Sequence, residues 1–153
     1  MDILFIAHLS SDDTQYETAD STAGGVGHLV RCLALASYIS DNYDCNSHLA
    51  LKCSSSEDNG LLQSAILSES VFSSVIPLDD LSILPGFLSK KRLKPHIVFF
   101  DINRIESRIV DCFPFSVRVN LAPRVSPLLD FHFSFLDTCC GDIVGSACGP
   151  QLT

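Results

Sequence analysis

The sequence contains no tryptophan, one methionine and seven cysteines, among which there is no Cys-x-x-Cys pair. An odd number of cysteines without that spacing fits neither a disulfide-stapled secreted domain nor the common zinc sites. No apolar run reaches the ~18 residues that a membrane span requires. Asp2 precedes the first apolar segment, where a secretory signal would carry basic residues. These absences predict a cytoplasmic protein with no membrane span, whose thiols act as small buried apolar groups.

Basic residues are also scarce, since 10 Lys and Arg face 18 Asp and Glu, which gives a net charge of −8. This balance argues against nucleic acid or an anionic membrane as a partner. The only basic cluster, at 90–94, is interpreted as a solvated helix end. His48, His96 and His132 have no partner spacing typical of a metal site, so neither a metal nor another cofactor is expected.

What the chain does have is apolar residues, at 46% of the total against 18% charged, over a length of 153 residues. This composition predicts one folded globular domain that spans residues 1–153. Short apolar runs recur and are predicted as strands at 3–7, 47–53, 71–78, 96–101, 117–121 and 131–135. Helical stretches are predicted between them at 28–40, 61–67 and 104–111. The alternation predicts an α/β fold, a three-layer parallel sheet with helices on both faces.

Three local details sharpen this prediction. In the first helix, apolar residues fall at helical spacing and form one buried stripe: Leu29, Cys32, Leu33, Ala36 and Ile39. Pro85-Gly86 is expected to break or kink the helix that Asp79 and Asp80 would otherwise start. Residues 131–135 alternate Phe-His-Phe-Ser-Phe, so His132 is expected to face water or the rim of a cleft.

Ligands of such parallel sheets bind beyond the carboxyl ends of the strands. Four landmarks are expected at that edge: His8, the turn at 24–28, Asp101 and Asn120. Asp101 at a strand end suits a ligand contact or, equally, the N-cap of the next helix. His8 suits a hydrogen bond to a phosphate or a sugar hydroxyl, although a plain loop residue is the commoner explanation.

The turn at 24–28 reads Gly-Gly-Val-Gly-His and leads into the first helix. It matches neither the dinucleotide fingerprint G-x-G-x-x-G nor the phosphate loop G-x-x-x-x-G-K-[ST]. A nucleophile elbow, G-x-S-x-G, is absent as well. Gly24, Gly25 and Gly27 permit a tight bend, and amides at a helix start attract anionic ligands. The positive end of the helix dipole disfavours an imidazolium, so His28 is predicted to be a neutral ring facing an open crevice, suited to act as a general base.

The segment at 25–36 resembles the signature G-x-G-H-x-x-R-C-L-x-L-A of a family of nucleotide-sugar hydrolases. These enzymes act in pseudaminic acid biosynthesis, and relatives are called spore-coat polysaccharide biosynthesis proteins. They are similar to glycosyltransferases of the GT-B fold. The resemblance implies a Rossmann-like N-terminal half of a GT-B fold, with His28 activating the water that attacks the anomeric carbon of a UDP-sugar. Asp101 matches an aspartate at the end of the family's central strand.

The chain also departs from this pattern. Ile102 and Asn103 stand where the family has a D-x-Y stretch, and Asn120-Leu121 replaces an Asp-Asp pair. The second GT-B domain, which supplies most nucleotide-binding groups, is expected to be missing from the chain and to be supplied by a second chain. Three functions follow: hydrolysis of a nucleotide sugar, acceptor binding in a glycosyltransferase, or a non-catalytic subunit that depends on a partner.

Overall fold

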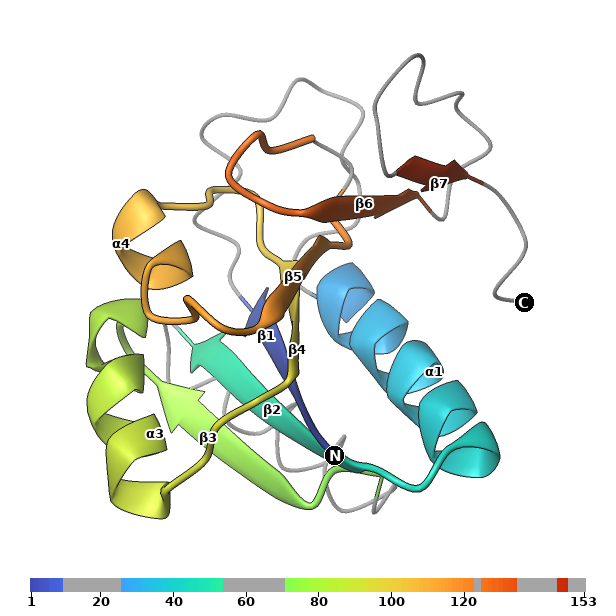
Figure 1. The fold of residues 1–153 in the computed structure, drawn as a ribbon, viewed down its shortest axis with the longest axis horizontal. Coiled ribbons are helices and arrows are strands. Elements are labelled where there is room, and N and C mark those ends of the chain that lie inside the picture. Colours follow the sequence, from blue (N-terminus) through green and yellow to red (C-terminus); the bar gives the residue numbers. More distant parts are fainter. Residues whose placement is uncertain (10–25, 54–70, 123–124, 135–145, 149–153) are drawn as a thin grey trace.

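The computed structural model describes residues 1–9, 26–53, 71–122, 125–134 and 146–148, and it places seven strands in one sheet (Figure 1). The strands are β1 Asp2–Leu9, β2 Asn46–Cys53, β3 Ser74–Leu78, β4 Ile97–Asp101, β5 Val117–Asn120, β6 Phe131–Ser134 and β7 Ser146–Cys148. Their order is β3-β2-β1-β4-β5-β6-β7, and every neighbouring pair is parallel. The predicted parallel α/β sheet is therefore confirmed.

The first strand, β1, lies in the interior of the sheet, where it pairs with β2 on one side and β4 on the other. Its apolar run is buried on both faces, as a strand between two helical layers must be. Ile3, Phe5 and Ala7 face one layer, whereas Leu4 and Ile6 face the other. The continuous rather than alternating apolar pattern of β1 thus reflects a strand with no solvent-facing side.

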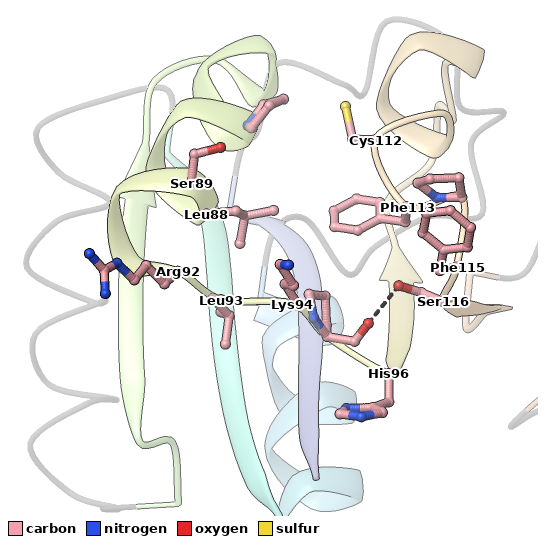
Figure 2. A pocket seen from close by; sticks show the side chains of 13 residues that line it. Leu88, Ser89, Arg92, Leu93, Lys94, His96, Cys112, Phe113, Phe115 and Ser116 are labelled. Carbon is pink, nitrogen blue, oxygen red and sulfur yellow. Dashed lines mark hydrogen bonds between the residues drawn. The ribbon is translucent and has the colours of Figure 1, made fainter.

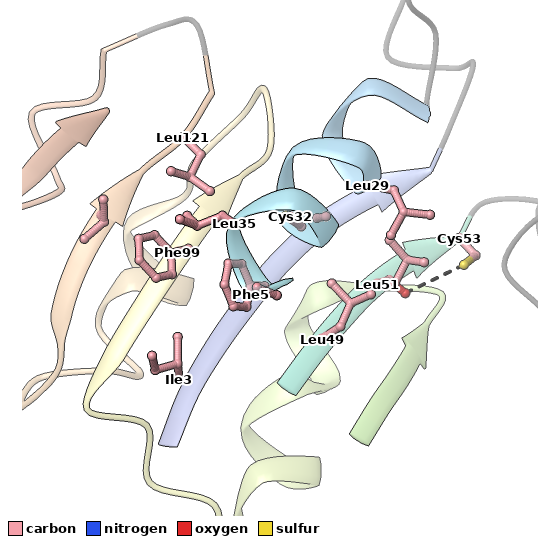
Figure 3. Packing of buried hydrophobic residues seen from close by; sticks show 13 residues of the cluster. Ile3, Phe5, Leu29, Cys32, Leu35, Leu49, Leu51, Cys53, Phe99 and Leu121 are labelled. Atoms are coloured by element: carbon pink, nitrogen blue, oxygen red, sulfur yellow. Dashed lines mark hydrogen bonds between the residues drawn. The ribbon is translucent and has the colours of Figure 1, made fainter. Parts of the chain in front are cut away.

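One face of the sheet is covered by α1 (Val26–Asn42), as Figures 1 and 3 show. Leu29, Cys32, Leu35 and Ala36 of this helix are buried against the strands. In Figure 3, Phe5 and Phe99 lie beneath it, with ring centroids 4.9 Å apart in a stacked arrangement. The predicted stripe is confirmed, and Leu35 joins it.

The opposite face is covered by three short elements: η2 (Leu81–Ile83), α3 (Leu84–Lys91) and α4 (Ser107–Val110). Leu84, Leu88, Ile109 and Val110 pack there against Leu4, Ile6, Ile76, Val98 and Phe100 of the strands. Helices therefore lie on both faces of the sheet, as the sequence predicts.

Asp80 caps a helix start as expected, but that helix is only the 3-10 turn η2, which ends at Ile83. A separate helix, α3, begins at Leu84 with Pro85 in its first turn, where the missing proline N–H has no intrahelical partner to lose, so the expected break falls just before Pro85. One expectation about α4 needs correction. The helix predicted at 104–111 is reduced to the single turn of α4. The exposed Lys90 and Lys91 occupy the last turn of α3, which confirms the interpretation of that cluster as a solvated helix end.

The prediction of which β6 side chains are exposed is wrong. Phe131 is exposed and His132 is buried, although the alternation Phe131, His132, Phe133 predicted buried phenylalanines and an exposed histidine. The neighbouring strand decides this, since His132 pairs in register with the buried Asn120 of β5. The last strand, β7, was not predicted, and the helix predicted at 61–67 lies outside the described residues.

Among the described residues, no helix combines the length and the apolar character that crossing a bilayer would require. In the same part of the chain, Cys32, Cys45 and Cys112 are free thiols, and Cys53 Sγ donates to the Leu51 carbonyl at 3.7 Å. Cys32 and Cys53 are buried in the α1 layer, as expected of cysteines that act as small apolar groups.

Candidate functional site

The strand order reverses between β1 and β4, which places a potential ligand crevice at the carboxyl ends of these two strands. Asp101 is the last residue of β4 and pairs in register with Ala7 of β1. His8 follows Ala7, so two of the predicted site residues lie side by side at this edge. Asp101 does not cap the next helix, because the N-cap of α4 is Glu106.

The first turns of α1 bring two further side chains onto the Asp101 carboxylate. The His28 Nδ1 atom lies 2.6 Å from Asp101 Oδ1. Arg31 donates from Nε to Asp101 Oδ2 at 2.9 Å and from Nη2 to Oδ1 at 2.8 Å. Both oxygens of a fully buried carboxylate are thereby engaged, and the arginine binds it in the bidentate geometry that suits a guanidinium.

The charge of Asp101 follows from these contacts. Burial pushes the pKa of the Asp101 carboxyl upward, but hydrogen bonds from His28 and Arg31 outweigh it and hold that pKa below its ordinary value. The carboxylate is therefore ionised at neutral pH. A buried carboxylate of this kind needs its cationic partner, because an unpaired charge in the interior is costly.

An ionised Asp101 also fixes the proton on His28. The Nδ1 atom lies 2.8 Å from Arg31 Nη2 and 2.6 Å from Asp101 Oδ1, and one ring nitrogen cannot both accept from the arginine and donate to the carboxylate. Since Asp101 only accepts, Nδ1–H donates to it, and the approach of Nη2 is a contact rather than a hydrogen bond. In the neutral ring the lone pair then lies on Nε2, which is the tautomer that a general base requires.

His8 packs against His28, with ring centroids 4.4 Å apart and ring planes tilted by 40°. Both imidazoles are buried, and His28 is only 7% exposed. The expectation that His28 faces an open crevice is therefore wrong, although its place beside the strand ends is as predicted. The ring is enclosed because the helix start turns it toward Asp101 and His8 rather than toward solvent.

The other predicted site residues are not part of this cluster as described. Gly24 and Gly25 lie outside the described residues. Gly27 is the second residue of α1, so its backbone is helical rather than part of the bend. Asn120 ends β5 on the strand next to β4, and its Oδ1 accepts from the Ala122 N–H at 3.0 Å, which holds the turn after the strand.

Arg31 was missed as a site residue. The helical pattern places it off the buried stripe, which is typical of a solvated arginine. The available indication was its spacing, since residues three apart on a helix lie on the same face and Arg31 is three residues after His28. That spacing is part of the quoted signature, but it does not reveal a carboxylate partner 70 residues away.

Two cavities lie at opposite edges of the sheet. A small one of about 210 Å³ adjoins His8 at the carboxyl edge. The larger, of about 1040 Å³, lies at the amino ends of β4 and β5, between the end of α3 and the segment before β5 (Figure 2). Ser116 Oγ donates to the Pro95 carbonyl there at 2.6 Å, and Phe113 and Phe115 contribute apolar wall. The larger cavity is remote from the buried Asp101, so volume does not identify the candidate site.

Within the described ranges, no three His, Cys, Asp or Glu side chains converge in a way that would hold a metal ion. Comparison with known proteins yields no family model, no curated protein and no solved structure that matches this chain. Among the described residues, the cluster of His28, Asp101, Arg31 and His8 is the feature that bears on function.

Proposed function

We propose that this chain forms one wall of the cleft of a nucleotide-sugar hydrolase and contributes the general base, His28. The observation that carries the proposal is the 2.6 Å contact between His28 Nδ1 and the ionised, buried Asp101, made at the edge where ligands of parallel sheets bind. A carboxylate that holds Nδ1–H orients the ring and stabilises the imidazolium that forms when Nε2 takes a proton.

In the proposed reaction, Nε2 removes a proton from water while the water oxygen bonds to the anomeric carbon of a UDP-sugar. The bond from that carbon to the phosphate oxygen breaks, and UDP leaves with the electron pair. Asp101 positions His28, and Arg31 in turn fixes Asp101 through its two hydrogen bonds. Proton removal by a positioned histidine accounts for rate factors of about 10²–10⁴.

Two features support a GT-B-like setting. The strands β3-β2-β1-β4-β5-β6 follow the order found in doubly wound nucleotide-binding folds. The segment at 25–36 carries the signature described above, and the structure places its His28 and Arg31 together on one carboxylate. In this proposal a second domain or a second chain supplies the nucleotide-binding wall.

A non-catalytic role is the second candidate, and the burial of His28 favours it. A ring that is 7% exposed and packed at a 40° tilt against His8 also suits a purely structural polar network. The two candidates differ in one respect: catalysis requires that a ligand reach Nε2, whereas a structural network does not.

The deciding experiments are NMR on the full chain with ¹⁵N-labelled histidine, titrated with UDP-N-acetylglucosamine, and an assay for free sugar on the chain together with a copurified nucleotide-binding partner, because the chain by itself supplies only one wall of the cleft. We expect the His28 Nε2 resonance to shift on ligand addition and sugar release to fall at least about 100-fold in His28→Gln. His96→Gln, an exposed histidine at the amino edge, is the matched control. An unshifted His28 resonance, or equal sugar release by His28→Gln, would overturn the hydrolase. Transfer of the sugar to an added acceptor would instead identify a glycosyltransferase.

A further inference from the structure

The small cavity at the carboxyl edge has an unusual balance of charges. Its charged and imidazole lining is His8 from β1, Lys52 from β2, Asp80 after β3, Arg104 after β4, and Glu106 and Arg108 at the start of α4. His8 and Lys52 are register partners on adjacent parallel strands, so their side chains emerge on the same face. Four loops or strand ends thus converge on one space of about 210 Å³.

Some of the charges at this cavity are already satisfied. Arg108 pairs with Glu106 at 2.6 Å. Asp80 Oδ1 accepts from the Ser82 N–H at 2.7 Å and caps η2, and this backbone hydrogen bond lowers the pKa of the Asp80 carboxyl. The cap engages Asp80 Oδ1, and a carboxylate has a second oxygen that can accept from a ligand hydroxyl.

Lys52 and Arg104 are different. Across the described ranges, neither side chain forms an ion pair. Lys52 lies close enough to Asp80 to help lower the pKa of that carboxyl. Among the described residues, three cations and two carboxylates line the cavity, so in a chain with a net charge of −8 this lining carries an excess of positive charge that suits an external anion.

We propose that this cavity binds the anionic group of a small hydroxylated ligand, with Lys52 and Arg104 holding a phosphate or carboxylate and Asp80 accepting from a hydroxyl. The volume corresponds to about seven water molecules at ~30 Å³ each, which suits one sugar ring or one phosphate and excludes a whole nucleotide sugar. The ligand class is therefore a sugar phosphate or an acidic sugar.

The cavity also reaches the proposed base. His8 lines it and packs at 4.4 Å on the ring of His28, so a bound ligand would contact the neighbour of the general base. This link to catalysis deepens the proposed function and rests on it, whereas anion binding by itself does not require turnover.

The test is isothermal titration of the full chain with four probes: inorganic phosphate, glucose 6-phosphate, glucuronate and glucose. We expect the anionic probes to bind and the double variant Lys52→Met, Arg104→Gln to weaken them at least about tenfold, since each charge-assisted hydrogen bond contributes substantially. The matched control is Lys90→Met, Arg92→Gln, which removes two exposed cations at the opposite edge. Asp80→Asn keeps a good N-cap and is expected to bind inorganic phosphate several-fold more tightly.

Preference among the anions identifies the group: glucose 6-phosphate above glucuronate indicates phosphate, and the reverse indicates carboxylate. Absence of anion binding, glucose binding as tightly as the anions, or unchanged affinity in the double variant would each overturn the proposal. The proposal of a hydrolase and the proposal of an anion site can be rejected independently of each other. A chain that binds glucose 6-phosphate through Lys52 and Arg104 but releases no sugar from UDP-N-acetylglucosamine retains the anion site and loses the hydrolase.

Discussion

The two edges of the sheet differ in what they bury. At the carboxyl edge, a small cavity adjoins a buried carboxylate that is bound by a histidine and an arginine. At the amino edge, a cavity about five times larger has mainly apolar walls, and the cations beside it, such as Lys94 and Arg92, are exposed (Figure 2). This contrast shows that a buried charge is a better indicator of a candidate functional site in a parallel sheet than the size of a cavity is.

The largest expected effect on the free energy of unfolding is at the amino edge, where two phenylalanines differ in burial. Phe113 is 3% exposed and packs at 6.1 Å from the ring of Phe100, whereas Phe115 is 99% exposed. Phe113→Ala should lower the free energy of unfolding by about 3–5 kcal/mol, because it leaves a cavity in the core. Phe115→Ala should change it by less than about 0.5 kcal/mol. Urea denaturation measures both, and equal losses would show that Phe115 is covered in solution.

The next effect concerns the carboxyl edge. Asp101→Ala should lower the free energy of unfolding by about 3 kcal/mol, because it leaves Arg31 without its partner. The value is at the low end for a broken ion pair since the Arg31 side chain is 26% exposed. Glu106→Ala, which removes a carboxylate from an exposed pair, should cost at most about 1 kcal/mol. Similar losses in the two variants would contradict the distinction between buried and exposed charge at this edge.

Acid should act on the carboxyl edge through the same residue. The pKa of Asp101 is lower in the folded chain than in the unfolded chain, so its contribution to stability is complete above about pH 4. That contribution is lost as the pH falls through the folded pKa, because the unfolded chain then binds the proton more readily. Stability of Asp101→Asn, measured by urea denaturation between pH 2 and 6, should therefore depend less steeply on pH than that of the unchanged chain. Parallel curves would show that Asp101 is not held by His28 and Arg31.

Thiol reactivity offers a smaller contrast within the α1 layer. Burial, and to a lesser extent the nearby Asp101, raises the pKa of the Cys32 thiol well above its ordinary value. Iodoacetamide should therefore label Cys45, which is partly exposed, at least about tenfold faster than Cys32 in the native chain. Peptide mass spectrometry of briefly labelled protein measures the two rates. Comparable rates would show that α1 opens readily from the sheet.

The smallest effect is expected at β6. Burial lowers the pKa of His132, and its Nδ1 has no hydrogen-bond partner among the described residues. Because the folded pKa is lower than the unfolded one, the chain should lose stability as the pH falls below about 6.5. His132→Gln should flatten this loss in denaturation curves between pH 5 and 7. An unchanged slope would indicate that His132 titrates as an exposed histidine does.

Much of the sheet was predictable because its strands are marked locally. The short apolar runs and the polar breaks between elements predicted six of the strands within a few residues, and helical spacing predicted α1. Where a local pattern conflicted with a neighbouring strand, prediction failed. His132 faces inward because it pairs in register with the buried Asn120 of β5.

Local sequence patterns are enough to predict a parallel sheet between helices, with His28, Asp101 and His8 near the carboxyl ends of its strands. These properties depend on periodicity and spacing over short stretches, which each segment carries independently. Three other features follow from long-range packing alone: Arg31 and His28 share the Asp101 carboxylate, His28 is enclosed, and Lys52 and Arg104 line one cavity. Those facts depend on contacts between residues far apart in the chain, whose distances are set by how the helices pack on the sheet.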